Sequence, residues 1–115
     1  MARKMSEQQR RRLEGMSMIG RDIRGRDKRG GPWAPGRVVD EVYVMFYDYK
    51  FMIQRIEFSR GKSWDGSRFG YRTGYYTYDK DMRRIKWGQF AQTLTERWYR
   101  RLLNKAKKKG WNLFS

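Results

Sequence analysis

The segment over residues 38–59, VVDEVYVMFYDYKFMIQRIEFS, is dense in β-branched and aromatic residues, and it restricts the possible folds more than any other part of the chain. Such residues favour strands, because their side chains pack well on a pleated, half-buried surface. We predict a hairpin with strands over about residues 41–47 and 51–58 and a turn at Asp48-Tyr49-Lys50. On the first strand, alternation places Val42, Val44 and Phe46 on one face.

The segment over residues 69–90, FGYRTGYYTYDKDMRRIKWGQF, predicts a second hairpin. Its strands are expected over about residues 69–77 and 82–91, with a turn near residues 78–81. Alternation in the second of these strands directs Ile85 and Trp87 towards the core.

A helix is predicted over residues 94–109. Thr93 and Glu96 have the spacing of a capping box, and Gly110 followed by Trp111 is typical of a glycine-terminated helix end. The fold class expected is therefore α+β, with a four-stranded antiparallel sheet of two hairpins packed by this C-terminal helix.

The N-terminal segment differs from the rest in composition. Ser6 and Gln9 have the spacing of a capping box, so we predict a helix over about residues 7–19, weakened by Gly15. An irregular basic connector is expected to follow. The predicted organisation is a basic N-terminal helix and arm over residues 1–37 and a single α+β domain over residues 38–115.

The chain carries 28 Lys and Arg residues against 12 Asp and Glu residues, which gives a net charge of +16. Most of the excess lies near the ends, with eleven basic against four acidic residues in 1–37 and seven against one in 93–115. Polyanions are the natural partners of such a chain. On the helix predicted over residues 94–109, Arg97, Arg101 and Lys105 follow one another at intervals of four residues and form a basic face. Like charges at this spacing cost about 0.2–0.5 kcal/mol per pair, whereas an ordinary solvated helix face alternates charge signs.

Several functional classes are disfavoured by composition. The sequence has no cysteine and no histidine, so disulfides, the commonest zinc sites and the usual general base are excluded. Asp48-Tyr49-Lys50, with Asp40 and Glu41 upstream, resembles the D…(D/E)-x-K pattern of metal-dependent nucleases, but its predicted place at a hairpin turn argues against that chemistry. We expect no enzyme activity, cofactor, metal or membrane attachment, and a cytoplasmic location.

The function predicted is nucleic-acid binding, with RNA favoured over DNA. The basic helix face and the arginine-rich arm would neutralise phosphates. Tyrosines on an open sheet face would stack on bases, or would pack against one another as cross-strand aromatic pairs. The candidate binding residues are Arg10, Arg11, Arg12, Arg21, Arg24, Arg26, Arg72, Tyr75, Tyr76, Arg84, Lys86, Arg97, Arg100, Arg101, Lys105 and Lys108. The alternative is an interaction protein that regulates or inhibits a larger nucleic-acid-processing complex by occupying an acidic or nucleic-acid-binding surface.

Overall fold

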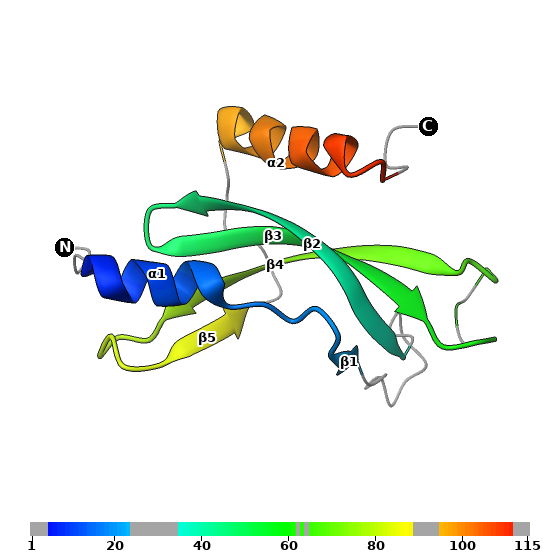
Figure 1. The fold of residues 1–115 in the computed structure, drawn as a ribbon, viewed down its shortest axis with the longest axis horizontal. Helices are drawn as coiled ribbons and strands as arrows, with labels where there is room; N and C mark the ends of the chain where they lie inside the picture. Colours follow the sequence, from blue (N-terminus) through cyan, green and yellow to red (C-terminus); the bar gives the residue numbers. More distant parts are fainter. Residues whose placement is uncertain (1–4, 24–34, 62, 64, 89–94, 112–115) are drawn as a thin grey trace. The chain divides into compact units, whose positions relative to one another are not determined.

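The structure, a computed structural model, describes residues 5–23, 35–61, 63, 65–88 and 95–111. Its elements are listed here in chain order and drawn in Figure 1: α1 (Glu7–Gly15), β1 (Asp22–Ile23), β2 (Gly36–Phe46), β3 (Tyr49–Phe58), β4 (Phe69–Tyr78), β5 (Ile85–Gly88) and α2 (Glu96–Lys108). The five strands form one antiparallel sheet in the order β1-β2-β3-β4-β5. The predicted α+β class is therefore confirmed, while the predicted number of four strands is wrong.

The additional strand is β1, which lies in the segment predicted as a basic arm. Asp22 pairs with Arg37 and Ile23 pairs with Gly36, so β2 begins earlier than predicted. Gly36 is required where it stands, because a Cβ atom there would lie 2.5 Å from the backbone carbonyl oxygen of Glu57. A strand of two residues has no hydrophobic period of its own, so its pairing could not be read from the sequence.

The chain forms two compact units, each described separately below. The first unit comprises Met1–Met16, Val42–Ile53 and Thr73–Ser115, and the second comprises Ser17–Glu41 and Gln54–Arg72. Neither helix in the described part of the chain is long and apolar enough to cross a membrane.

The core of the first unit combines side chains from both helices with side chains from the strands. Leu13 of α1 and Ala106 of α2 are completely buried, as is Met52 of β3. The face of β2 predicted to be apolar is confirmed at Val42 and Val44, which are also buried. Complete burial of a leucine or methionine side chain contributes about 1.5–3 kcal/mol. Leu102 of α2 is buried as well, so each helix contributes at least one large apolar side chain to this core.

Helix α2 ends as the sequence predicts. Gly110 has a φ of 79°, and its N–H donates to the carbonyl oxygen of Lys107 at 3.0 Å. The N–H of Trp111 donates to the carbonyl oxygen of Ala106 at 3.2 Å, and the indole is buried. This is the Schellman arrangement, in which a left-handed glycine satisfies the last carbonyls of a helix.

The beginning of α2 differs from the prediction. The helix starts at Glu96 with Thr95 as its N-cap, and the Thr95 side chain makes no capping hydrogen bond. Thr93, the predicted cap, lies outside the described residues. Thr95 stands two positions after Thr93, and the presence of threonine at both positions made the start of the helix ambiguous in the sequence.

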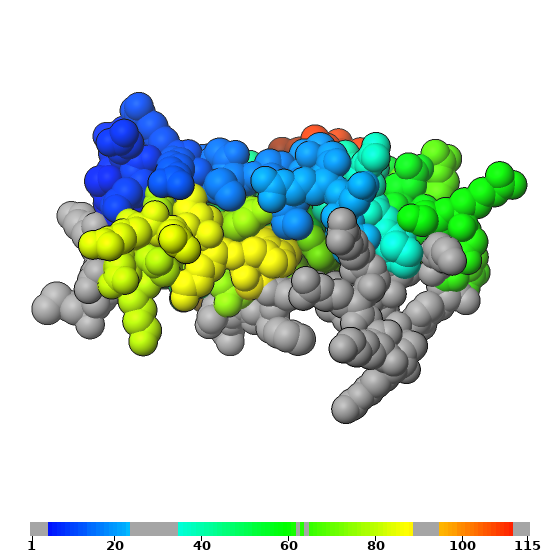
Figure 2. Space-filling view, turned by 90° about the horizontal axis from the view of Figure 1, so that it is seen from below, coloured from blue at the N-terminus to red at the C-terminus, as the bar shows by residue number. Residues whose placement is uncertain are grey.

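Helix α1 has the predicted capping box. The Ser6 hydroxyl accepts from the backbone N–H of Gln9 at 3.1 Å, and the Gln9 side chain accepts from the backbone N–H of Ser6 at 2.8 Å. Gln9 also donates to the carbonyl oxygen of Met82 at 3.3 Å. Figure 2 shows α1, in blue, against the yellow part of the β4–β5 hairpin. The helix ends at Gly15 rather than near residue 19.

The first hairpin turns at Tyr47 and Asp48, so the predicted turn at Asp48-Tyr49-Lys50 is wrong. Lys50 belongs to β3 and is only 3% exposed. Its ammonium group donates to the carbonyl oxygen of Glu14 at 2.6 Å and to that of Met16, at the C-terminal end of α1. A residue that the sequence assigns to a solvated turn therefore holds a helix end.

The second hairpin joins β4 to β5, where Tyr76 pairs with Trp87 and Tyr78 pairs with Ile85. The two rings of Tyr76 and Trp87 lie 5.1 Å apart between centroids. Trp87 also lies against Gly74, where any Cβ atom would meet the indole. Strand β5 is shorter than predicted, and residues 89–91 of the predicted strand lie outside the described residues.

Candidate functional site

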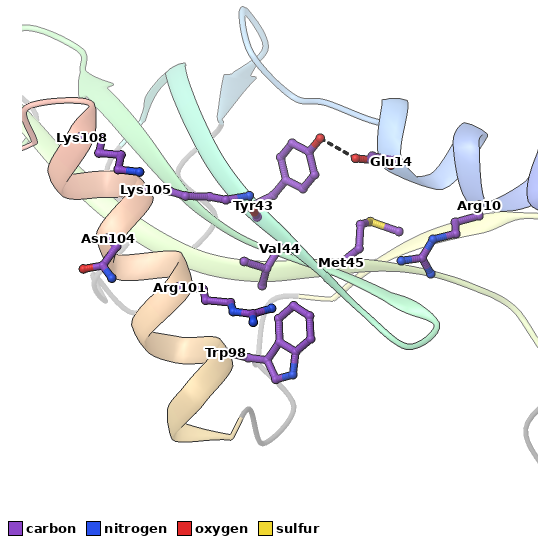
Figure 3. Close-up of a pocket in the computed structure, with 10 residues that line it drawn as sticks. All are labelled: Arg10, Glu14, Tyr43, Val44, Met45, Trp98, Arg101, Asn104, Lys105 and Lys108. Carbon is purple, nitrogen blue, oxygen red and sulfur yellow. Dashed lines mark hydrogen bonds between the residues drawn. The ribbon is translucent and has the colours of Figure 1, made fainter.

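A groove of about 550 Å³ lies in the first unit, and α1, β2 and α2 all contribute to its lining (Figure 3). Helix α1 supplies Arg10 and Glu14, and β2 supplies three consecutive residues. The full set of lining residues is Arg10, Glu14, Tyr43, Val44, Met45, Trp98, Arg101, Asn104, Lys105 and Lys108. In Figure 3, the side chains from α1 and from α2 lie on either side of β2.

The α2 side of the groove follows from helical spacing. Trp98, Arg101, Lys105 and Lys108 recur at intervals of three and four residues, which places them along one side of a helix. Leu102 of the same helix is buried, so packing orients the helix and leaves the charged stripe at the groove. The position of the charged stripe therefore follows from the burial of the apolar side of α2.

Two of these cations are supported by aromatic rings. The guanidinium carbon of Arg101 lies 4.6 Å from the Trp98 ring centroid, which is a cation–π contact. The Lys105 ammonium donates to the backbone carbonyl oxygen of Tyr43 at 2.7 Å and lies 5.1 Å from the Tyr43 ring centroid. These contacts hold the cations at the groove without neutralising them.

The groove is strongly positive, because four cations line it against the single carboxylate of Glu14. Among the described residues, the ion pairs found involve Arg11, Arg37, Arg68 and Arg100, and none of them uses a cation of the groove. All four groove cations belong to solvent-exposed residues. An anionic ligand could therefore reach them.

Glu14 is directed at a tyrosine rather than at the cations. The Tyr43 hydroxyl donates to a Glu14 carboxylate oxygen at 2.7 Å. The pKa of Tyr43 is raised, chiefly by this hydrogen bond, and further by burial and by the negative charge of Glu14. The phenol therefore stays protonated and keeps the carboxylate in place.

The structure brings four of the predicted binding residues together in the groove: Arg10, Arg101, Lys105 and Lys108. Arg12 and Arg97 are exposed on the same two helices, and Arg11 and Arg100 are exposed in ion pairs with Glu7 and Glu96. Arg21 is exposed in the second unit. Arg24 and Arg26 lie outside the described residues.

The predicted tyrosine platform on the sheet is altered by packing. Tyr76 is only 4% exposed and its ring packs on Trp87, so the ring contributes to the packing of the first unit, and its role in binding stays a prediction. Tyr75 is half-buried, with its ring centroid 5.4 Å from that of Tyr49. Arg84 and Lys86, by contrast, are exposed as predicted.

Arg72 takes part in a polar network of the second unit instead of facing solvent. Its Nε donates to the Gln54 side-chain oxygen at 2.6 Å, and the Gln54 nitrogen donates to Glu41 at 2.6 Å. The Glu41 carboxylate also accepts from the Ser17 hydroxyl at 2.6 Å. Gln54 is completely buried, so Arg72 helps to satisfy a core polar group, and its predicted role in binding is not supported by this packing.

The side chains of Asp48 and Lys50, from the nuclease-like triplet, lie in different surroundings. Lys50 is buried against the end of α1, whereas Asp48 lies in the hairpin turn and lines a different pocket. Within the described ranges, no group of three or more His, Cys, Asp or Glu side chains could hold a metal ion.

Sequence reasoning missed the aromatic and acidic members of the groove. Trp98 precedes Arg101 by three residues, and this spacing places it at the edge of the basic stripe. Glu14 and Tyr43 are distant in the sequence, and no local pattern joins them. Comparison with known proteins found no matching family model, no similar curated protein and no similar solved structure.

Proposed function

We propose that the protein binds nucleic acid, with RNA preferred over DNA, and that the groove between α1, β2 and α2 receives the phosphate backbone. The observation that carries the proposal is the convergence of Arg10, Arg101, Lys105 and Lys108 on one groove that holds a single carboxylate. Lysine and arginine side chains that neutralise phosphates release condensed counterions, and this release drives binding.

A solubilising role explains this arrangement less well. Solubility requires only dispersed charge, whereas here like charges are placed four residues apart on α2 at a cost of about 0.2–0.5 kcal/mol per pair. Exposed cations outside the groove, such as Arg97 and Lys107, extend the positive surface of the helix. A polyanion would relieve the repulsion among them.

The preference for RNA rests on the aromatic side chains near these cations. Trp98 lies within the groove, with its ring centroid 4.6 Å from the guanidinium carbon of Arg101. Proteins recognise RNA mostly through unpaired bases, which stack on aromatic rings or guanidinium planes. The proposed activity is binding, and no step of catalysis is assigned to the groove.

The experiment is fluorescence anisotropy with labelled single-stranded RNA and DNA of 20 nucleotides and identical sequence in 100 mM salt. The groove variant carries R101E, K105E and K108E. The control variant carries R60E, K80E and R83E, which change the net charge equally at exposed residues outside the groove. At this salt concentration, three lost contacts to a single strand weaken affinity by about a hundredfold.

We expect this loss in the groove variant and a change of less than about fivefold in the control variant. Equal losses in both variants would show that net charge alone drives binding and would contradict the assignment of the groove. Equal Kd values for RNA and DNA would contradict the preference for RNA. Absence of binding to either, together with capture of an acidic protein, would favour the alternative role as an interaction protein.

A further inference from the structure

The β2–β3 turn exposes a tyrosine in a backbone conformation that disfavours tyrosine. Tyr47 is 76% exposed and has a φ of 53°. It is the first residue of a two-residue hairpin turn, and Asp48, the second, is not among the residues with positive φ in the described part of the chain. Glycine is preferred at the first position of such a turn, because it adopts positive φ without a steric penalty.

Packing does not explain why a large aromatic side chain occupies this position. The Tyr47 ring touches the edge of Phe46, with centroids 4.6 Å apart and planes at 75°. Most of the ring remains accessible to solvent. A residue that is both conformationally unsuited and exposed is a candidate for a role in binding.

Tyr47 is joined to the groove by one direct contact and by one contact that runs through Phe46. Arg10, which lines the groove, donates from its guanidinium to the Tyr47 carbonyl oxygen at 3.3 Å. Phe46, which supports the Tyr47 ring, also packs on Trp98 of the groove, with centroids 5.5 Å apart. Tyr47 therefore borders the groove at Arg10, at the turn that ends β2.

We propose that Tyr47 stacks on an unpaired base of the nucleic acid whose phosphates occupy the groove, so that the ligand is single-stranded at this point. The inference rests on the proposed function and deepens it. Every base offers a π face, so a tyrosine at this position would bind single strands with little dependence on sequence. A continuous duplex keeps its bases stacked inside and has none to offer.

The variant that tests the inference is Tyr47→Gly, because glycine suits the turn and removes the ring. Tyr47→Phe keeps the ring without the hydroxyl, and Tyr99→Ala removes the other exposed tyrosine of the first unit, which is 45% exposed on α2. Each protein is titrated with a labelled 20-nucleotide single-stranded RNA and with a blunt RNA duplex of the same length. Thermal unfolding is recorded for each variant.

We expect Tyr47→Gly to weaken single-strand binding by about tenfold while duplex binding changes by less than twofold. Tyr47→Phe and Tyr99→Ala should bind the single strand within about twofold of the wild type, and the melting temperature of Tyr47→Gly should not fall by more than a few degrees. A 20-nucleotide strand in which every nucleotide is abasic should bind the wild type more weakly than the intact strand does, and this loss should be smaller for Tyr47→Gly.

Unchanged single-strand affinity in Tyr47→Gly would overturn the inference, and so would an equal loss for single strand and duplex. If the groove variant loses affinity and Tyr47→Gly does not, the stacking role fails and the proposed function stands. If wild type binds neither ligand, both fail together.

Discussion

Replacement of Lys50 by methionine should strongly destabilise the first unit. Lys50 is almost completely buried, and its ammonium group donates to the carbonyl oxygens of Glu14 and Met16. The same group lies 4.3 Å from the Tyr43 ring centroid. The last carbonyls of a helix have no partner within the helix, so Lys50 supplies one for the end of α1.

The size of the effect follows from these contacts. Each hydrogen bond from a charged donor contributes about 1.5–3 kcal/mol, and a desolvated cation–π contact contributes about 2 kcal/mol. Methionine fills a similar volume and avoids the cost of burying the ammonium, which offsets several kcal/mol of this sum. We expect a net loss of about 2–4 kcal/mol in the free energy of unfolding. At about 4 °C per kcal/mol for a chain of this size, the melting temperature should fall by about 8–16 °C.

Thermal unfolding followed by circular dichroism at pH 7 measures this loss, and Lys80→Met at an exposed position is the matched control. Hydrogen exchange should also be faster at the amides of α1 in Lys50→Met, because the helix has lost its attachment to β3. A melting temperature within about 2 °C of the wild type, with α1 protection unchanged, would refute the reasoning.

Two further substitutions test local contacts. Tyr43→Phe removes the hydrogen bond to Glu14; because folding raises the pKa of Tyr43, the stability this residue provides is present below about pH 10 and lost as pH rises through the folded pKa. Urea unfolding between pH 8 and 11 should therefore show a steeper loss in the wild type than in Tyr43→Phe, and parallel curves would contradict this. Gly36→Ala places a Cβ atom against a backbone carbonyl oxygen and should cost about 1–3 kcal/mol, whereas Gly15→Ala, with no atom within 4 Å, should stabilise α1 by up to about 1 kcal/mol. Similar urea midpoints for these two alanine variants would show that the close approach at Gly36 is unimportant.

Local sequence signals predicted those parts of the fold that depend on neighbours in the chain. The capping box at Ser6 and the glycine end at Gly110 involve residues within one helical turn, and both are present. The two hairpins follow from dense β-branched and aromatic segments. The pairing of β1 could not be predicted in this way, because two residues carry no periodic signal.

Residues with tertiary roles were the ones misassigned. Lys50 was predicted in a turn, because nothing in the local sequence indicates that the end of α1 supplies two carbonyl oxygens to its ammonium group. Arg72 and Tyr76 were expected on a surface open to nucleic acid. In the structure Arg72 donates to Gln54, and the Tyr76 ring packs on Trp87. A basic face of the C-terminal helix was predicted, but its meeting with Arg10 was not, since nothing local relates Arg10 to cations distant in the sequence.

The salt dependence of RNA binding tests the central proposal most directly. The logarithm of the association constant for single-stranded RNA is measured against the logarithm of salt concentration for the wild type, the R101E/K105E/K108E variant and the R60E/K80E/R83E variant. Each phosphate contact to a single strand adds about 0.7 to the magnitude of the slope, so losing three should reduce it by about 2 in the groove variant and by almost nothing in the control. Slopes that fall equally in both variants, or in neither, would contradict phosphate binding in the groove.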